Sequence, residues 1–306
     1  MNRQRFIQCN AVGQIAAGYT YAYLATFGWK TVFYVGGILP ILLAPLFYML
    51  LPEPVEYMVM KGAPRRRIAQ ILARIDPTRS FDAATEFVVP PENKSGFQIY
   101  QLFRDGRAAL TSVLWVVFFT SIMAIYFYNN WIPTLLNGSG LSQGEIVTIT
   151  TALPFGGVVG TLLIAPVLIK LGSFRTVALG YLCAAIAMIV LASAGSTFLA
   201  LALCVFAVGF FLIGTQSALN ASSALIYPPS LRSPGVGWGF GIGRIGSIIS
   251  PSIAGVLVAF HWQPAQLFLI AAVPTFVASL TAYVLMTMLR KSAARPASSL
   301  GDKALA

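Results

Sequence analysis

Residues 176–231 read TVALGYLCAAIAMIVLASAGSTFLALALCVFAVGFFLIGTQSALNASSALIYPPSL, and none of these 56 positions carries a charged side chain. Because about 20 apolar residues cross the core of a bilayer, the run is too long for one transmembrane helix. Gly195-Ser196-Thr197 supplies a turn signal between its halves. The run therefore predicts two consecutive transmembrane helices, over residues 176–194 and 197–222.

The composition extends this prediction to the whole chain. Of the 306 residues, 57% are hydrophobic and 9% are charged, whereas a soluble domain has about 25% charged residues. The same figures exclude a disordered chain. Other uncharged runs, of which 233–289 divides at a turn near Pro264, predict the remaining spans. The expected fold is all-α and integral to the membrane, with eight transmembrane helices near residues 7–27, 31–51, 109–135, 146–169, 176–194, 197–222, 235–259 and 265–289.

Lysines and arginines are distributed unevenly between the two sides of the predicted bundle. If the N-terminus is cytoplasmic, 18 of the 20 basic residues fall in cytoplasmic segments, and only Lys30 and Arg244 do not. This bias predicts a cytoplasmic N-terminus and, with an even number of spans, a cytoplasmic C-terminus. Topology and anionic lipid headgroups then account for the net charge of +11. We therefore expect the lipid bilayer, and no nucleic acid, as a partner.

A long polar segment, residues 52–107, is expected on the cytoplasmic side as a linker loop. Within it, residues 63–75 place Ile68, Ile71 and Leu72 on one helical face and arginines on the other, which predicts a short helix at the membrane surface. The predicted parts are a remnant of an N-terminal bundle with two transmembrane helices (1–51), the linker (52–107), a C-terminal six-helix bundle (108–290) and a cytoplasmic tail (291–306).

A faint internal repeat suggests why the predicted N-terminal part, residues 1–51, has only two transmembrane helices. Residues 27–29 (FGW) precede an apolar span containing Pro40, and residues 260–262 (FHW) precede one containing Pro274. The second pair closes a set of six spans, and two parallel sets of six are a known architecture of transporters. By the same logic, the first copy of the repeat should also close a set of six helices, and the sequence contains two of them. We therefore expect a chain that lacks the first four helices of a 6+6 fold.

Arg244 is the one charged residue within a predicted span of the C-terminal bundle. An ionisable side chain at membrane depth is a functional hypothesis by default. Helical spacing places Gly237 and Gly241 on the same stripe, which leaves room beside a planar guanidinium, and a guanidinium binds a carboxylate with two parallel hydrogen bonds. The alternative is an arginine bonded to carbonyl groups of a neighbouring helix.

Amide side chains mark two further helical faces. Gln216 and Asn220 lie four residues apart on one face, and Tyr126, Asn129 and Asn130 share a face of another predicted span. Amides in hydrocarbon need partners, so each face points to a cavity or to another helix. Both roles are open for each face. We expect the two faces to converge with the arginine on one binding site.

Residues suited to catalysis or metal binding are scarce in the predicted spans. None of these spans contains Asp or Glu, and the single histidine, His261, lies at a turn. This argues against a metal site, a cofactor and an acid–base catalyst, so we do not expect an enzyme. Residues 241–246 match G-x-G-x-x-G, but no strand precedes them. Helix packing through closely spaced glycines is the better interpretation.

Residues 216–255, QSALNASSALIYPPSLRSPGVGWGFGIGRIGSIISPSIAG, closely resemble the tenth and eleventh helices of the aromatic acid:proton symporters of the major facilitator superfamily. Residues 28–40 and 130–136 (NWIPTLL) resemble the same family more loosely. The likeness runs from about residue 5 to 290. It implies that the predicted spans correspond to helices five to twelve of that fold.

The resemblance also implies roles for individual residues. It makes Arg244 the arginine that holds the substrate carboxylate or takes part in gating. With the polar faces described above, the expected substrate-binding residues are Arg244, Gln216, Asn220, Tyr126, Asn130 and Trp238. The expected gating residues in the cytoplasmic loops are Lys170, Arg175 and Arg232. Where relatives carry G-x-x-x-D-R-x-G, residues 165–172 read APVLIKLG, so the acidic partner for gating is missing.

The expected function is secondary active transport of small aromatic or other organic acid anions with protons across the bacterial inner membrane. The acidic residues that couple protons in the family lie on its first helix, which has no counterpart in this sequence. One alternative is a gene fragment or assembly partner that transports nothing. Another is a major facilitator with a different substrate, such as a sugar or a drug. The missing carboxylates disfavour a channel-like protein.

Overall fold

The structure is a computed structural model of the chain, and every element that it describes is a helix. The chain divides into two compact units, Leu24–Lys94 and the remainder, which we describe separately. The residues described are 29–50, 58–59, 61–75, 98–137, 139–195, 197–228 and 231–293.

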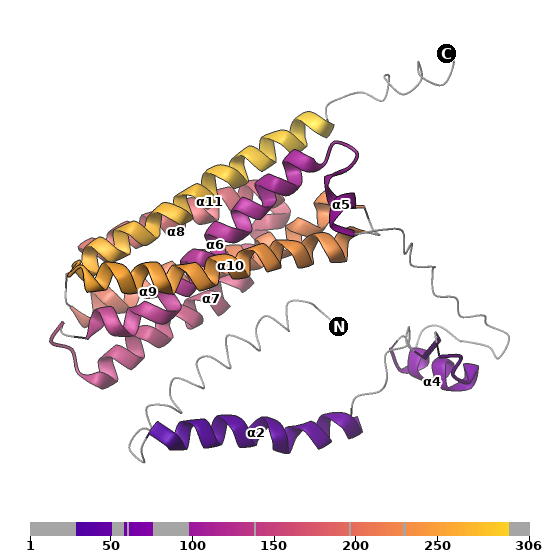
Figure 1. The fold of residues 1–306 in the computed structure, drawn as a ribbon, viewed down its shortest axis with the longest axis horizontal. Helices are drawn as coiled ribbons and strands as arrows, with labels where there is room; N and C mark the ends of the chain where they lie inside the picture. The colour runs from indigo at the N-terminus through magenta and orange to yellow at the C-terminus, as the bar shows by residue number, and fades with distance from the viewer. Residues whose placement is uncertain are drawn as a thin grey trace. The chain divides into compact units, whose positions relative to one another are not determined.

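Six helices in the described part of the larger unit are long and apolar enough to cross a membrane (Figure 1). They confirm six of the predicted spans, each to within three or four residues at its ends. They are α6 (Ala108–Leu136), α7 (Gln143–Leu171), α8 (Ser173–Ser193), α9 (Phe198–Ser223), α10 (Arg232–Ala259) and α11 (Pro264–Ala293). Two short helices, α5 (Gln98–Phe103) and η2 (Ala224–Ile226), precede α6 and follow α9.

Turn residues separate these helices where the sequence predicts. Between α8 and α9, Gly195 has a φ of +67°, a conformation that costs glycine little and other residues more. α11 begins with Pro264, whose fixed φ suits the first helical position. At the start of α7, Ser142 and Glu145 form a reciprocal capping box that satisfies two free backbone N–H groups.

The smaller unit contains α2 (Trp29–Leu50) and α4 (Arg65–Ile75). α2 corresponds to the predicted span 31–51, but its apolar stretch, Phe33–Leu46, is shorter than a full span. α4 confirms the helix predicted within residues 63–75. The predicted span 7–27 lies outside the described residues, so the total of eight transmembrane helices stays a prediction.

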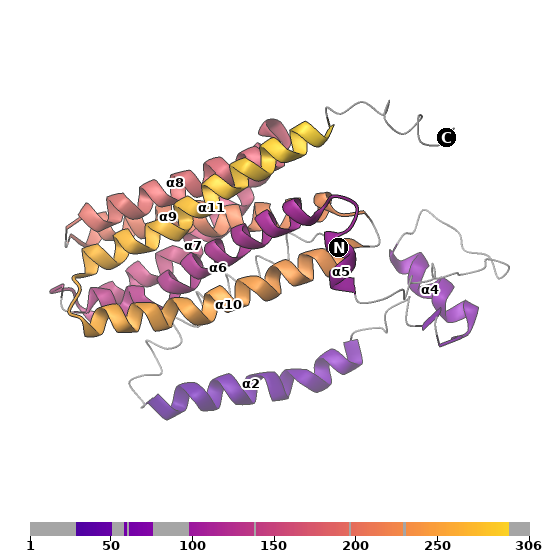
Figure 2. The same ribbon diagram turned by 45° about the horizontal axis from the view of Figure 1, so that its top comes forward.

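The six spans pack in a pattern that repeats after three helices. The closely packed pairs are α6 with α10, α7 with α9, α8 with α11, α8 with α9, and α6 with α11. Exchanging α6, α7 and α8 for α9, α10 and α11 maps this set of pairs onto itself. Because three spans reverse the direction of the chain across the membrane, the two triplets are inverted repeats. α6 and α10 run side by side in both ribbon views (Figures 1 and 2).

Glycines bring the two symmetry-related pairs of helices together. On α10, a Cβ built at Gly239 or Gly243 would meet side chains of α6. On α7, a Cβ built at Gly156 or Gly160 would meet backbone carbonyl groups of α9. Small residues let helix backbones approach closely, which is how helices associate in a medium as apolar as their own side chains. The glycine packing predicted for α10 is confirmed, and its counterpart lies on α7.

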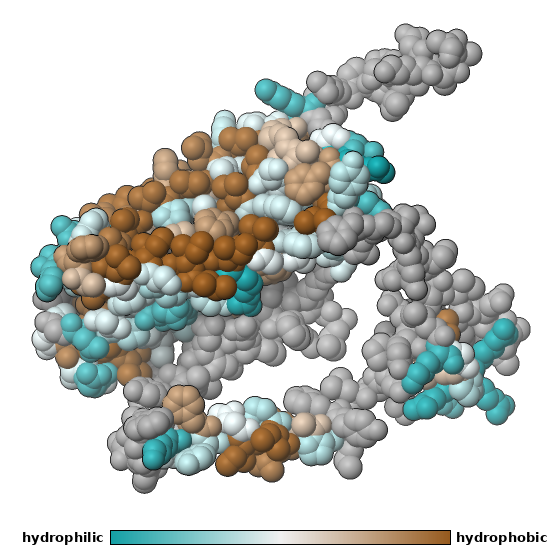
Figure 3. Space-filling model, in the orientation of Figure 1, coloured by the Kyte–Doolittle hydropathy of each residue, from teal (hydrophilic) through white to brown (hydrophobic). Residues whose placement is uncertain are grey.

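Apolar side chains cover much of the bundle surface in Figure 3, and hydrophilic side chains gather towards its ends. On α11, Val273, Phe276 and Leu280 lie on one face and are 54–58% exposed. Water would make such a continuous apolar face unfavourable, whereas lipid tails accommodate it. The larger unit is therefore built as a multi-pass membrane domain.

Candidate functional site

α10 has two faces with different surroundings. Gly235, Gly239 and Gly243 are buried, because Tyr227 and α6 pack against them. At Gly237 and Gly241, by contrast, a built Cβ would meet no atom within 4 Å. This second face is the one that carries Arg244, so the open stripe predicted beside the arginine is present among the described residues.

Arg244 projects from the middle of α10 to a tyrosine of α6. Its Nη1 donates a hydrogen bond to the Tyr126 hydroxyl, and its guanidinium carbon lies 5.6 Å from the centre of the tyrosine ring. Among the described residues, no carboxylate pairs with this guanidinium. The arginine is thus held in place by a neutral partner, and its positive charge is left for an anion.

Two aromatic residues of α10 lie close to Arg244 in the sequence and contact aromatic rings of α6. Trp238 stacks on Trp115, with ring centroids 6.3 Å apart and an angle of 30° between the planes. Phe240 lies one helical turn before Arg244, and its ring centroid is 5.2 Å from that of Phe118. Trp238 and Phe240 remain more than a third exposed. The open face of α10 therefore combines one cation with aromatic surface.

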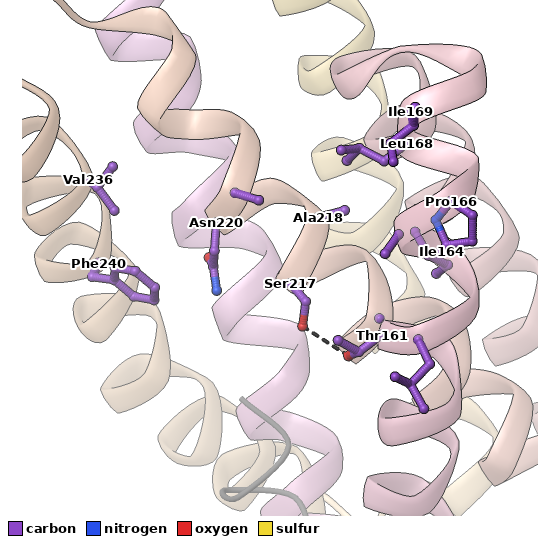
Figure 4. A pocket seen from close by; sticks show the side chains of 14 residues that line it. Thr161, Ile164, Pro166, Leu168, Ile169, Ser217, Ala218, Asn220, Val236 and Phe240 are labelled. Atoms are coloured by element: carbon purple, nitrogen blue, oxygen red, sulfur yellow. Dashed lines mark hydrogen bonds between the residues drawn. The ribbon is translucent and has the colours of Figure 1, made fainter. Parts of the chain in front are cut away.

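A cavity of about 710 Å³ opens between α7, α9 and α10 (Figure 4). Its lining is mostly aliphatic, with Val236 and Phe240 contributed by α10. Three polar side chains reach it, Thr161 from α7 and Ser217 and Asn220 from α9. A concave, largely apolar cavity of this volume with a few placed polar groups is typical of sites for small molecules.

A chain of hydrogen bonds leads from the bundle core to this cavity. The buried Tyr181 hydroxyl of α8 donates to Gln216 Oε1 at 2.8 Å. Gln216 Nε2 then donates to Asn220 Oδ1 at 3.1 Å. Gln216 therefore links α9 to α8 through a hydrogen bond, whereas Asn220 lines the cavity. The structure brings together these two predicted residues, but Arg244 is not among the residues that line the cavity, so their convergence with the arginine stays a prediction.

The remaining predicted residues lie elsewhere. Asn130 is exposed near the end of α6 and is not among the residues that line the cavity. Its neighbour Asn129 donates to the Ile125 carbonyl of its own helix at 2.9 Å.

The basic residues predicted for gating lie at helix ends. Lys170 is in the last turn of α7 and Arg175 in the first turn of α8, and both are exposed. Arg232 begins α10 and donates from Nε to the Tyr227 carbonyl at 3.3 Å. None of the three forms an ion pair with a described residue.

Thr161, Ser217 and Tyr181 were not singled out from the sequence. Hydroxyl groups are common in transmembrane helices and usually bond to their own backbone, as Thr161 does to the Gly157 carbonyl at 2.8 Å. Thr161 and Ser217 are identified by the contact between α7 and α9, which the glycine spacing on α7 suggests but does not specify, and Tyr181 by its hydrogen bond from α8 to Gln216 of α9. In the residues that the structure describes, no cluster of three metal-ligating side chains occurs.

Two inverted triplets of apolar helices are an architecture found in membrane transporters that are built from repeats. The sequence comparison specifies the family. A family model described as Major Facilitator Superfamily matches residues 8–192 and 114–304, so the chain belongs to the Major Facilitator Superfamily.

Curated relatives of the chain are transporters of aromatic acids. The chain is 34% identical to the gallate transporter of Pseudomonas putida over 83% of this chain and 56% of that protein. It is 31% identical to the 4-hydroxybenzoate transporter PcaK of Acinetobacter baylyi, over 89% of this chain and 61% of the relative. The benzoate transport protein of the same organism is 28% identical over 92% of this chain and 61% of its own length. The chain thus spans a little more than half of the length of these relatives.

A solved structure supports the fold independently. The fucose:proton symporter FucP of E. coli superposes with a TM-score of 0.55 and covers 93% of this chain and 70% of its own. At 13% sequence identity, this likeness concerns the fold alone.

Proposed function

We propose that the chain belongs to a transporter of small aromatic carboxylates, which moves them together with protons across the bacterial inner membrane. The similarity to transporters of gallate, 4-hydroxybenzoate and benzoate supports this substrate class. Because the chain spans a little over half of these relatives, transport, substrate and coupling are properties that we assign to the whole transporter.

The observation that carries the proposal is the unpaired cation on the open face of α10. Arg244 is held by a tyrosine and by no described carboxylate, and Trp238 and Phe240 of the same helix offer aromatic surface. An aromatic acid presents a carboxylate for the guanidinium and a ring for stacking. A neutral sugar would use neither the charge nor most of the apolar lining.

We place the six described spans as a C-terminal bundle over residues 108–290, after a linker over 52–107 and two spans within 1–51, with both termini in the cytoplasm. The basic residues at the α7–α8 connection and at the start of α10, Lys170, Arg175 and Arg232, then lie on the cytoplasmic side and gate it. Alternating access would rock this bundle against an N-terminal one around the site beside Arg244.

Proton coupling is assigned to groups outside the six described spans. The one carboxylate in these helices is Glu145, which caps the first turn of α7 and accepts hydrogen bonds from Ser142. This carboxylate already accepts hydrogen bonds at the start of α7, and it is about 100 residues from Arg244 in the sequence. We therefore do not assign proton coupling to Glu145.

Tryptophan fluorescence tests the proposed site directly. We expect 4-hydroxybenzoate to quench the emission of the purified chain in nanodiscs, with saturation, because the acid would bind at Arg244 on α10, the helix that also carries Trp238. The Trp238→Phe variant should lose most of this response. Trp262→Phe, at the turn after α10, is the matched control and should keep it. Quenching that persists in Trp238→Phe, or that fucose produces equally well, would refute the proposal.

A further inference from the structure

The cavity between α7, α9 and α10 has polar atoms on one side, where α7 meets α9. Ser217 and Asn220 are three residues apart on α9, and Thr161 of α7 lies 3.1 Å from Ser217 between the hydroxyl oxygens (Figure 4). Residues three apart on a helix are neighbours on its surface, so one ligand atom can contact both Ser217 and Asn220. The rest of the lining is aliphatic or aromatic.

The hydrogen bonds behind Asn220 determine which end of its amide is available. A tyrosine hydroxyl has one proton, and that of Tyr181 is donated to Gln216 Oε1. Gln216 therefore turns its Nε2 to Asn220 and occupies Oδ1 of the asparagine. Nδ2 of Asn220 has no partner among the described residues, so asparagine offers the cavity a hydrogen-bond donor.

The hydroxyl pair beside it offers an acceptor. Thr161 donates to the Gly157 carbonyl at 2.8 Å, and Ser217 lies 3.2 Å from the Ile213 carbonyl of its own helix. The two hydroxyl protons are thus available for three possible hydrogen bonds, counting the one between the two hydroxyl groups. Whichever bond Ser217 makes, its oxygen keeps a lone pair that can accept from a ligand.

Phe240 relates the cavity to the arginine, because both residues lie on α10. Phe240 lines the cavity and precedes Arg244 by four residues on α10. At 1.5 Å per residue, that separation is about 6 Å along the helix, comparable with the length of a substituted benzene ring. An aromatic acid whose carboxylate meets Arg244 can therefore extend its ring into the cavity.

We propose that Asn220, Ser217 and Thr161 form a subsite for a hydroxyl group on the aromatic ring of the substrate. The ring hydroxyl donates to Ser217 and accepts from Asn220 Nδ2. Tyr181 and Gln216 are positioning residues, because they fix the orientation of the Asn220 amide without touching the ligand. This inference rests on the proposed function, and it makes the site selective for hydroxylated over unsubstituted aromatic acids.

The test compares two probes, 4-hydroxybenzoate and benzoate, on the 306-residue chain in nanodiscs. We expect the wild-type chain to bind 4-hydroxybenzoate about 10-fold more tightly, since its hydroxyl forms hydrogen bonds that benzoate leaves unmade. Ser217→Ala should lower this ratio to about 3 or less while the affinity for benzoate stays the same. Ser222→Ala removes a hydroxyl that bonds only to its own helix, one turn further along, and should leave the ratio unchanged.

A second pair of variants tests the positioning role. Tyr181→Phe keeps the ring and removes the donor to Gln216, so the ratio between the two acids should fall. Tyr128→Phe is the matched control, because its buried hydroxyl donates to the Phe268 carbonyl at 3.3 Å, away from the cavity. A purely structural effect of Tyr181→Phe would lower the affinity for both acids equally. That result would contradict the positioning role.

The remaining outcomes separate the two proposals. A wild-type chain that binds both acids with equal affinity, or a ratio that survives Ser217→Ala, would overturn the subsite and leave the aromatic acid site intact. A wild-type chain that binds neither acid would overturn the proposed function and the subsite with it.

Discussion

Replacing Arg244 with alanine is expected to weaken the binding of 4-hydroxybenzoate to the chain at least about 100-fold, or about 2.7 kcal/mol. The guanidinium of Arg244 lies on the open face of α10, and no carboxylate among the described residues pairs with it. Charge-assisted, bidentate hydrogen bonds to a carboxylate are among the strongest in proteins, and alanine provides none of them. Equilibrium binding to purified protein in nanodiscs measures the loss.

Two control variants distinguish the role of the arginine from a general effect of charge. Arg244→Lys keeps the positive charge but loses the planar fork, so it should bind the acid with intermediate affinity. Arg290→Ala removes an exposed arginine from the last turn of α11 and should bind as the wild type does. Full affinity in a folded Arg244→Ala protein would show that the carboxylate binds elsewhere.

Replacing Gly160 with alanine is expected to lower the melting temperature of the detergent-solubilised chain by about 5 °C or more, which corresponds to about 2 kcal/mol. A Cβ at this position would collide with the backbone carbonyl of Phe210, and backbone cannot move aside as a flexible side chain can. Gly214 of α9 in turn approaches the backbone of Gly160. The two helices would have to move apart at this contact.

Gly144→Ala supplies the matched control on the same helix. Gly144 lies in the first turn of α7, and a Cβ there meets no atom within 4 Å. Alanine favours a helix over glycine by about 1 kcal/mol, so this variant should melt at the same temperature or higher. If Gly160→Ala melted like Gly144→Ala, α7 and α9 would not be packed through their glycines.

The spans could be predicted because a bilayer imposes their length and excludes charge. The run over 176–231 divides at Gly195 as expected, since the positive φ of that residue and the apolar stretches on either side are local properties. The two faces of α10 were also predictable, because glycines four residues apart mark a contact stripe and Arg244 lies off it. These features depend on spacing within one helix.

The polar side of the cavity could not be predicted in the same way. Gln216 and Asn220 were expected to share one role, but Gln216 bonds to Tyr181 of another helix and Asn220 lines the cavity. Thr161 and Ser217 meet only because α7 and α9 cross at their glycines. Such contacts depend on how helices pair, and a single sequence gives the faces of helices without their partners.

Competition between a carboxylate and its amide tests the central claim most directly. Labelled 4-hydroxybenzoate is bound to the wild-type chain in nanodiscs, and unlabelled benzoate or benzamide is added. The two competitors share the ring, but only benzoate carries the charge that Arg244 is proposed to bind. We predict that benzoate displaces the label with saturation and that benzamide does so at least about 100-fold less well. Equal displacement by both, or no saturable binding of the label, would contradict the account.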